Sequence, residues 1–471
     1  MSFASDESRW SDVWLAATAR GTTICGDFLA ATALALALQG AGAGGLAVSG
    51  LLLAATLPLV VLAPLAGRLA DRVDSRTLLV TIGLLQTVIC ALLAVVERPV
   101  LVVGLVTLLA CGLAVTQPCL AALLPAMVRA ADLPRASAIS QTAVSLGALG
   151  GPVLAGLLVG QFGTRVPLLL DAVTYLALVV AGLLLRTRRG GRRPAGAPGQ
   201  TGPAGAPGQT GPAGAANPAG TAVAWRLRRD PLMLLMVVST AVVIAAIGGI
   251  NVIEVFFIRE TLDGSATTFG LVTAAWMAGM LPGAWFAARV ANRLDDDGAL
   301  VRGVLATLGV CSLMVLLAST VPVAVLLVPL WLVGGAANGG QNVFANLLTT
   351  RRVPEAVRAR AYASYGAAVQ GGSMVGFLSG GALLTAVAPR PLIAGAGVVG
   401  LLVVLLFVPV AASAVRRRRT VAPDGGQPLA TGPDAGLATP GRPAEPDPEA
   451  GDTVGSWLSA SHARGSGTSS S

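Results

Sequence analysis

Long apolar runs, separated by short polar stretches, make up most of the chain. Each run approaches or exceeds the roughly 20 residues that an α-helix needs to cross about 30 Å of hydrocarbon. The pattern predicts an all-α integral membrane protein with twelve membrane-spanning helices. They lie near residues 13–38, 46–67, 77–96, 100–127, 137–160 and 166–186 before a central polar stretch, and near 231–256, 268–290, 299–318, 321–350, 361–387 and 391–415 after it.

A repeated phrase relates the two halves. Residues 68–74 read Arg-Leu-Ala-Asp-Arg-Val-Asp, and residues 289–295 read Arg-Val-Ala-Asn-Arg-Leu-Asp, 221 positions later. Each copy follows an apolar run and begins a short basic loop. A shorter echo relates residues 135–138 to residues 358–361, which are 223 positions apart. Chance similarity in an Arg- and Ala-rich chain is the alternative. Matching offsets favour duplication and predict two pseudo-symmetric six-helix bundles.

The placement of charge predicts the orientation. Only 12% of the residues are charged, whereas soluble domains have roughly 25%. If the N-terminus lies inside, the inner loops between spans hold twenty arginines and the outer loops hold four. The positive-inside rule then predicts a multi-pass protein of the cell membrane with both termini in the cytoplasm. The same loops account for the net charge of +9, so we expect no nucleic-acid partner.

Composition divides the chain into five parts. We expect a cytoplasmic segment at 1–12, a first bundle at 13–186, a linker at 187–230, a second bundle at 231–415 and a disordered cytoplasmic tail at 416–471. Within the linker, glycine recurs at every third position from Gly196 to Gly214. Seven triplets with this collagen-like period favour a flexible tether over a triple helix.

The stretch between the second and third spans resembles the loop signature of the major facilitator superfamily, Gly-x-Leu-Ala-Asp-Arg-x-Gly-Arg-[Lys/Arg]. The matching residues are Gly67, Leu69, Ala70, Asp71, Arg72 and Arg76. Asp74 and Ser75 replace the usual Gly and Arg. The resemblance implies a conformational switch that latches the halves together when the protein opens outward, through charge-assisted bonds. Asn292 takes the place of Asp71 in the second copy, which predicts an asymmetric latch. The alternative is that the arginines of this loop only set the membrane orientation.

A stretch in the fifth span resembles the exporter signature of the same superfamily, Gly-x-x-x-Gly-Pro-x-x-Gly-Gly. The matching residues are Gly147, Gly151, Pro152 and Gly156. Small residues four apart allow two helices to approach closely, and a proline inside a helix kinks it. The resemblance implies an antiporter that exports its substrate, and ordinary close packing is the alternative.

Three further stretches and one pair of residues are similar to the twelve-span proton-coupled exporters of drugs, siderophores and macrolides. The stretches are residues 118–125, 132–136 and 351–355, and the pair is Gly26-Asp27. Together the resemblance covers roughly residues 10–415. It implies the major facilitator fold and transport of a small molecule, and we expect a monomer in the lipid bilayer.

Ionisable residues within the spans are candidates for coupling. Each costs about 2.5–3.5 kcal/mol to insert at membrane depth. Asp27, Asp171 and Glu254 are the candidate proton-coupling acids, because removal from water favours the neutral carboxyl form. Arg20 shares a helix face with Asp27, but about 10 Å of rise prevents direct pairing. The alternatives are a structural anchor for Asp27, a helix cap for Asp171 and an interfacial pair with Arg259 for Glu254.

Polar side chains in the spans predict the lining of a central cavity. Asn338, Asn342 and Asn346 repeat every fourth residue and form a stripe on one helix face. Facing lipid would leave their amides without partners, so the stripe should face a cavity or a neighbouring helix. The remaining candidates for the lining are Arg20, Gln117, Asn251 and Gln341. Hydrogen bonding between helices is the alternative for these groups.

The sequence favours a secondary transporter over an enzyme. The five cysteines lie in apolar runs without metal-ligand spacing, and the one histidine, His462, lies in the tail, so we expect no metal or cofactor. Without lysine, the chain has no Gly-x-x-x-x-Gly-Lys-[Ser/Thr] loop for a nucleotide. We expect export of a small organic molecule, a drug or secondary metabolite, in exchange for protons. A proton-coupled nutrient importer and a transport-dead scaffold or sensor are the alternatives.

Overall fold

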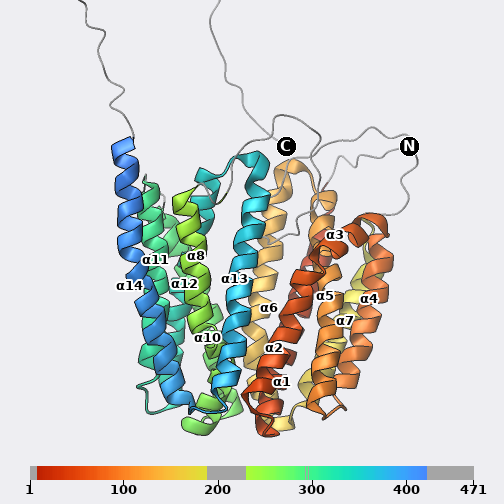
Figure 1. Ribbon diagram of the computed structural model, residues 1–471. Helices are drawn as coiled ribbons and strands as arrows, with labels where there is room; N and C mark the ends of the chain where they lie inside the picture. The colour runs from red at the N-terminus through yellow and green to blue at the C-terminus, as the bar shows by residue number, and fades with distance from the viewer. Residues whose placement is uncertain (1–7, 188–226, 228–229, 292, 295, 422–471) are drawn as a thin grey trace, which may run out of the picture. The chain divides into compact units, whose positions relative to one another are not determined.

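The computed structural model describes residues 8–187, 227, 230–291, 293–294 and 296–421, and its described elements are all helical (Figure 1). The N-terminal bundle contains α1 (Trp10–Gly40), α2 (Gly44–Val61), α3 (Ala63–Arg72), α4 (Ser75–Leu93), α5 (Pro99–Met127), α6 (Leu133–Phe162) and α7 (Arg165–Leu184). The C-terminal bundle contains α8 (Pro231–Ile247), α9 (Ile250–Phe256), α10 (Ala266–Ala291), α11 (Asp297–Ala318), α12 (Leu327–Arg352), α13 (Glu355–Leu383) and α14 (Pro389–Val421). A π-helical turn, η3 (Phe257–Thr261), extends α9.

The predicted fold of twelve helices in two bundles is confirmed. Within the described residues, eleven helical segments are long and apolar enough to cross a membrane, with α8, α9 and η3 counting as one. The twelfth crossing is α13, whose 29 residues are long enough to span. It is less apolar because it carries residues such as Ser364, Gln370 and Ser373. The Gly-repeat linker and the chain beyond Val421 lie outside the described residues, and α14 continues through the first residues of the predicted tail.

The second span and the loop after it differ from the prediction. The residue after α2 is Leu62, and α3 then runs from Ala63 to Arg72, so most of the expected switch loop is helical. Only Val73 and Asp74 separate α3 from α4. Pro64 stands in the first turn of α3, where a proline costs no hydrogen bond. The signature therefore forms the end of a helix and a two-residue turn.

Glycines let helices within each bundle pack backbone to backbone. A Cβ atom on Gly147 of α6 would collide with the carbonyl oxygen of Gly21 on α1, and one on Gly151 would lie 2.6 Å from the carbonyl oxygen of Cys25. In the second bundle, Gly335 and Gly339 of α12 lie equally close to the backbone of α10. Between apolar helices in lipid, close packing of this kind is a main source of association.

The described hydrogen bonds between the two bundles lie toward one end of the helices. We call the end where α1 begins the terminal face and the opposite end, with the α1–α2 and α13–α14 connections, the distal face (Figure 1). Helix α6 touches α10, and α2 touches α13. The inter-bundle hydrogen bonds among described side chains all lie in the distal half. They run from Gln39 to Glu260 at 3.1 Å, from Ser49 to the carbonyl oxygen of Phe377, and from Thr267 to the carbonyl oxygen of Gly156 at 3.2 Å.

Gly156 is one of the points where the backbones of the two bundles approach closely in this distal contact. A Cβ atom there would lie 2.7 Å from the carbonyl oxygen of Ala266 and 3.1 Å from the Cα atom of Gly270. We predict that Gly156→Val opposes distal closure by about 1–3 kcal/mol, which shifts a two-state population about 5- to 150-fold. Spin labels at positions 41 and 386, one on each bundle, should report a longer distance at the distal face.

Gly160→Ala is the matched control for that experiment. It lies one turn further along α6, where a Cβ atom would be 3.4 Å from the Thr267 hydroxyl, an ordinary contact. It should leave the distance distribution unchanged. An unchanged distribution in Gly156→Val as well would show that this contact does not hold the bundles together.

Candidate functional site

A buried acidic cluster lies between α1, α4 and α7 in the N-terminal bundle. The Tyr175 hydroxyl donates a hydrogen bond to Oδ1 of Asp27. The Cys90 thiol lies 3.1 Å from Oδ2 of Asp171, to which it donates. Asp171, Tyr175 and Cys90 are fully buried, whereas Asp27 is only partly buried. The structure thus brings two of the three candidate acids together, although they lie 144 residues apart in the sequence.

A glycine permits the two acids to approach. A Cβ atom on Gly26 would collide with Oδ1 of Asp171 and with the hydroxyl of Thr174, so only glycine leaves room for this carboxyl group against α1. Asp171 lies inside α7, which begins at Arg165, and it does not cap that helix. The alternative role of Asp171 as a cap is therefore wrong. Its carboxyl group points at the backbone next to Asp27.

Arg20 is the other charged residue of α1 at membrane depth. It is partly buried, and its Nε atom is buried without a hydrogen-bond partner among the described residues. The described ion pairs do not include it. Asp27, two helical turns away, is bonded to Tyr175 instead. Arg20 therefore forms no ion pair with the acidic cluster in the described structure.

Glu254 lies apart from the other two acids, on α9 in the C-terminal bundle. It is 7% exposed, and its Oε1 atom has no hydrogen-bond partner in the described structure. Trp331 of α12 lies within reach of the carboxyl group and packs edge-on against Trp276. Arg259 donates to the carbonyl oxygen of Gly264 at 2.9 Å. The expected alternative pair between Glu254 and Arg259 is therefore not formed.

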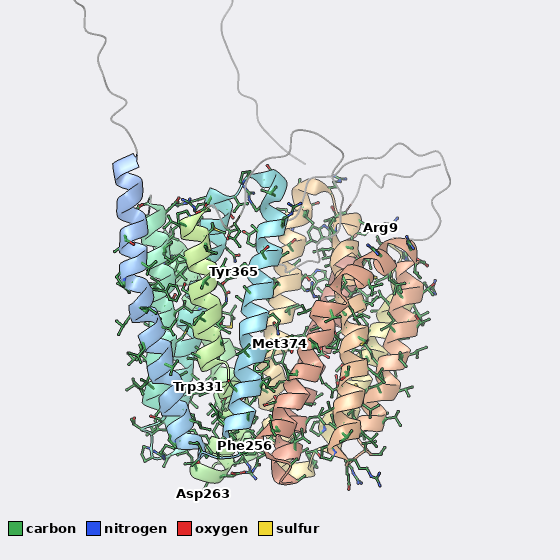
Figure 2. All side chains as sticks on the ribbon, viewed as in Figure 1. Arg9, Phe256, Asp263, Trp331, Tyr365 and Met374 are labelled. Atoms are coloured by element: carbon green, nitrogen blue, oxygen red, sulfur yellow. The ribbon has the colours of Figure 1, made fainter. Side chains whose placement is uncertain are left out.

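The amides of the C-terminal bundle divide into two groups. Gln341 is 1% exposed and donates to the Tyr365 hydroxyl at 2.7 Å, so it joins α12 to α13. Figure 2 shows Tyr365 nearer the terminal face than Trp331. The other amides of α12, Asn338, Asn342 and Asn346, are partly buried. Their spacing keeps them on one face of the helix, and Gln341, three residues after Asn338, lies at the edge of that face.

The two remaining candidates for the cavity lining occupy different surroundings. Gln117 is partly buried on α5, and Asn251 is exposed on α9, where its amide donates to the carbonyl oxygen of Gly248 at 3.1 Å. A hollow of about 410 Å³ opens at the distal face between the bundles, bordered by Gln39, Phe256 and Leu384 among others. None of the predicted lining residues borders this hollow.

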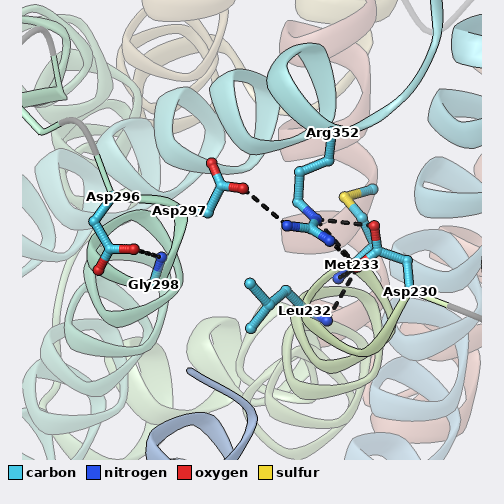
Figure 3. Close-up of polar contacts among 7 residues, drawn as sticks. All are labelled: Asp230, Leu232, Met233, Asp296, Asp297, Gly298 and Arg352. Carbon is cyan, nitrogen blue, oxygen red and sulfur yellow. Dashed lines mark hydrogen bonds and ion pairs between the residues drawn. The ribbon is translucent and has the colours of Figure 1, made fainter. Parts of the chain in front are cut away.

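The switch signature is described through its backbone and part of its side chains. Leu69 and Arg72 are exposed and Arg76 is partly buried, while Gly67 and Asp71 are placed by their backbone in α3. The C-terminal bundle has a well-defined ionic cluster at the same face. Arg352 at the end of α12 binds Asp230 at 2.8 Å and Asp297 at 2.8 Å (Figure 3). Asp230 also caps α8 by accepting from the backbone amides of Leu232 and Met233.

A corresponding anchor lies in the N-terminal bundle. Asp12, which is 4% exposed, accepts hydrogen bonds from the backbone amide of Thr187 at 3.0 Å and from its hydroxyl at 2.7 Å. Thr187 closely follows α7, and Asp230 directly precedes α8. The linker therefore leaves the N-terminal bundle at Thr187, which is hydrogen-bonded to Asp12, and enters the C-terminal bundle at Asp230, which is paired with Arg352.

Comparison with known proteins identifies the family. The family model described as Major Facilitator Superfamily matches residues 16–257 and 236–445, which is more than half of the chain. The chain belongs to the major facilitator superfamily. This facilitator is a multi-pass membrane protein and a transporter rather than an enzyme, and transporters of this family carry small molecules. No curated protein matches its sequence.

Solved structures share the fold of this facilitator at low sequence identity. The nucleoside transporter NupG, in a mutant form, has a TM-score of 0.62 and 14% identity over 86% of this chain and 98% of its own. An auto-inhibited POT family peptide transporter has a TM-score of 0.64 and 13% identity over 86% and 97%. A bacterial homologue of the human lysosomal transporter Spinster, inward-facing and unoccupied, has a TM-score of 0.58 and 15% identity over 87% and 97%.

The sequence did not indicate several polar partners of the candidate residues in this facilitator. Tyr175 follows Asp171 by four residues, and this helical spacing is a signal that could have placed both on one face of the sixth span. In the sequence, Arg352 indicated only the membrane orientation and a resemblance to the family. Its two acidic partners come from other helices, and no local spacing indicates them. Cys90 resembled an ordinary packing residue.

Proposed function

We propose that this protein exports a small organic molecule, a drug or secondary metabolite, in exchange for protons by alternating access. The observation that carries the proposal is the Asp27–Asp171 cluster. Two carboxyl groups lie together at membrane depth without a basic side chain in contact among the described residues. Such groups are stable there only if at least one is protonated, which suits them to carrying protons.

The distal contact supports a particular state in this cycle. If both termini are cytoplasmic, as the arginine distribution favours, the distal face is extracellular. Inter-bundle hydrogen bonds confined to the distal half then correspond to an inward-facing conformation, from which an exporter takes up its substrate. Asn338, Asn342, Asn346 and Gln117 are proposed to line the path, with Arg20 near its cytoplasmic part.

The exporter signature supports the direction of transport. Gly147 and Gly151 pack α6 against α1, and Gly156 packs the same helix against α10 of the other bundle. One helix thus joins the acid-bearing helix α1 to the distal contact. We propose that this connection links protonation in the N-terminal bundle to opening of the distal face, in a monomer embedded in the cell membrane.

An efflux assay tests the function. Cells that overproduce the protein should retain less of a transported compound than cells with the vector alone, and a protonophore should abolish the difference. A screen of candidate antibiotics supplies the compounds. Unchanged retention throughout the screen would contradict export.

Two assays separate the alternative functions. Counterflow in oriented vesicles distinguishes an exporter from a proton-coupled importer, because it reports the side on which substrate binds. Removal of residues 420–471 should leave transport intact, whereas a scaffold or sensor that signals through the tail would lose its function.

A further inference from the structure

The donor and acceptor pattern around Asp171 distinguishes the two acids of the N-terminal bundle. The Thr174 hydroxyl oxygen lies 2.8 Å from the backbone carbonyl oxygen of Asp171 and 3.2 Å from Oδ1 of the same residue. A hydroxyl group has one hydrogen, and the shorter contact to the backbone carbonyl uses it. The contact to Oδ1 is then favourable if the carboxyl group of Asp171 carries the hydrogen.

Asp27 has the opposite pattern. Its Oδ1 atom accepts from the Tyr175 hydroxyl, which is a bond that an ionised carboxylate makes well. Asp27 also keeps part of its surface exposed, whereas Asp171 is fully buried. If the carboxyl group of Asp171 were ionised, its only side-chain donors among the described residues would be the Cys90 thiol, which is a weak donor, and the Thr174 hydroxyl.

The side chains around the cluster provide too little positive charge for both Asp27 and Asp171 to be ionised. The groups that face Asp27 are Tyr175 and Asp171 from α7 and Cys90 from α4. On α1 itself, Cys25 lies close to Asp171. Helix α6 presents Gly147 and Gly151 to this part of α1 and adds no charge. Arg20 lies two helical turns from Asp27 on α1 and forms none of the described ion pairs, so two ionised acids here would have no cation in contact.

We propose that Asp171 keeps its proton throughout the cycle and that Asp27 alone exchanges one, so this cluster moves one proton per substrate molecule. The proton leaves Asp27 for water on the terminal side, and the carboxylate that remains is held by the Tyr175 hydroxyl. Asp171 is a positioning residue, which presents a neutral acid beside Asp27. The stoichiometry rests on the proposed antiport, whereas the protonation states do not.

Infrared spectroscopy of the full-length protein in lipid films tests the protonation states without any transported molecule. Wild-type protein should show one protonated-carboxyl band that disappears as the pH rises and one that persists. Asp27→Asn should remove the first band and Asp171→Asn the second. Glu97→Gln is the control, since its 84% exposed side chain lies outside the cluster, and it should change neither of these bands. Glu254→Gln identifies any band from the third acid.

Two measurements keep the proposal testable if Asp171→Asn does not fold. Thr174→Val removes the hydroxyl acceptor, so it should shift the frequency of the persistent band and leave the titrating band in place. The proton-to-substrate ratio of the Glu254→Gln variant in vesicles, which keeps only this pair of candidate acids, should be one. The proposal is wrong if both bands titrate together, if Asp171→Asn removes the titrating band, or if Thr174→Val leaves the persistent band unshifted. Absence of proton-driven transport with both bands as expected would overturn the proposed function but not the assignment of the two acids.

Discussion

Asp27→Asn is expected to reduce proton-driven efflux to the level of protein-free vesicles. The side-chain amide of asparagine does not release or take up a proton at physiological pH, but its oxygen can still accept the hydrogen bond from Tyr175. The variant should therefore fold and bind substrate normally. Proteoliposomes that contain the protein, with an imposed pH difference and a substrate found in the efflux screen, provide the measurement.

Counterflow separates a coupling defect from a loss of binding in this variant. Exchange of labelled for unlabelled substrate at equal pH requires no net movement of protons, so Asp27→Asn should still perform it. Glu97→Gln, which removes an exposed acid at the distal face, should keep both activities. Efflux by Asp27→Asn at the wild-type rate would exclude Asp27 as the coupling group.

Arg352→Ala is expected to destabilise the C-terminal bundle strongly. The side chain of Arg352 is 6% exposed and that of its partner Asp230 is 9% exposed. Removal of one member of a buried ion pair costs about 3–5 kcal/mol, because the other charge is left buried without compensation. The melting temperature of the purified protein in detergent should fall clearly. The loss should also free the ends of α8 and α12 from each other.

Two variants calibrate this loss. Arg165→Ala breaks an ion pair with Glu97 whose side chains are 69% and 84% exposed, and such pairs contribute at most about 1 kcal/mol. Replacing both partners, as Arg352→Met with Asp230→Asn, should recover part of the stability, because the asparagine oxygen can still cap α8. If Arg352→Ala melts at the same temperature as Arg165→Ala, the cluster in Figure 3 contributes no net stability.

The fold followed from the sequence because lipid imposes a simple rule. Backbone groups without water must bond within a helix, so apolar runs of the right length report helices directly. The rule says less about α3. Residues 67–72 are polar enough to suggest a loop, but a new helix that begins at Ala63, with Pro64 in its first turn, continues to Arg72. Composition could not distinguish a helix at the membrane surface from a turn.

The site was predictable one residue at a time but not as an arrangement. Asp27, Asp171 and Glu254 stood out because charged groups at membrane depth are rare. Which acids meet depends on how α1, α4 and α7 rotate against each other, and Gly26 sets that approach. A glycine next to an aspartate is one of 59 glycines in the sequence, so its effect becomes visible only in three dimensions.

The hydrogen bonds at Thr187 and Asp230 have a mechanical consequence. In the proposed alternating-access cycle, any tension in the linker would pull first on these two residues. At one end the load passes through Asp12 into the first turn of α1, and at the other it passes through Arg352 into α11 and α12. The pull is thus spread over several helices at once, and neither α7 nor α8 has to unwind from its free end.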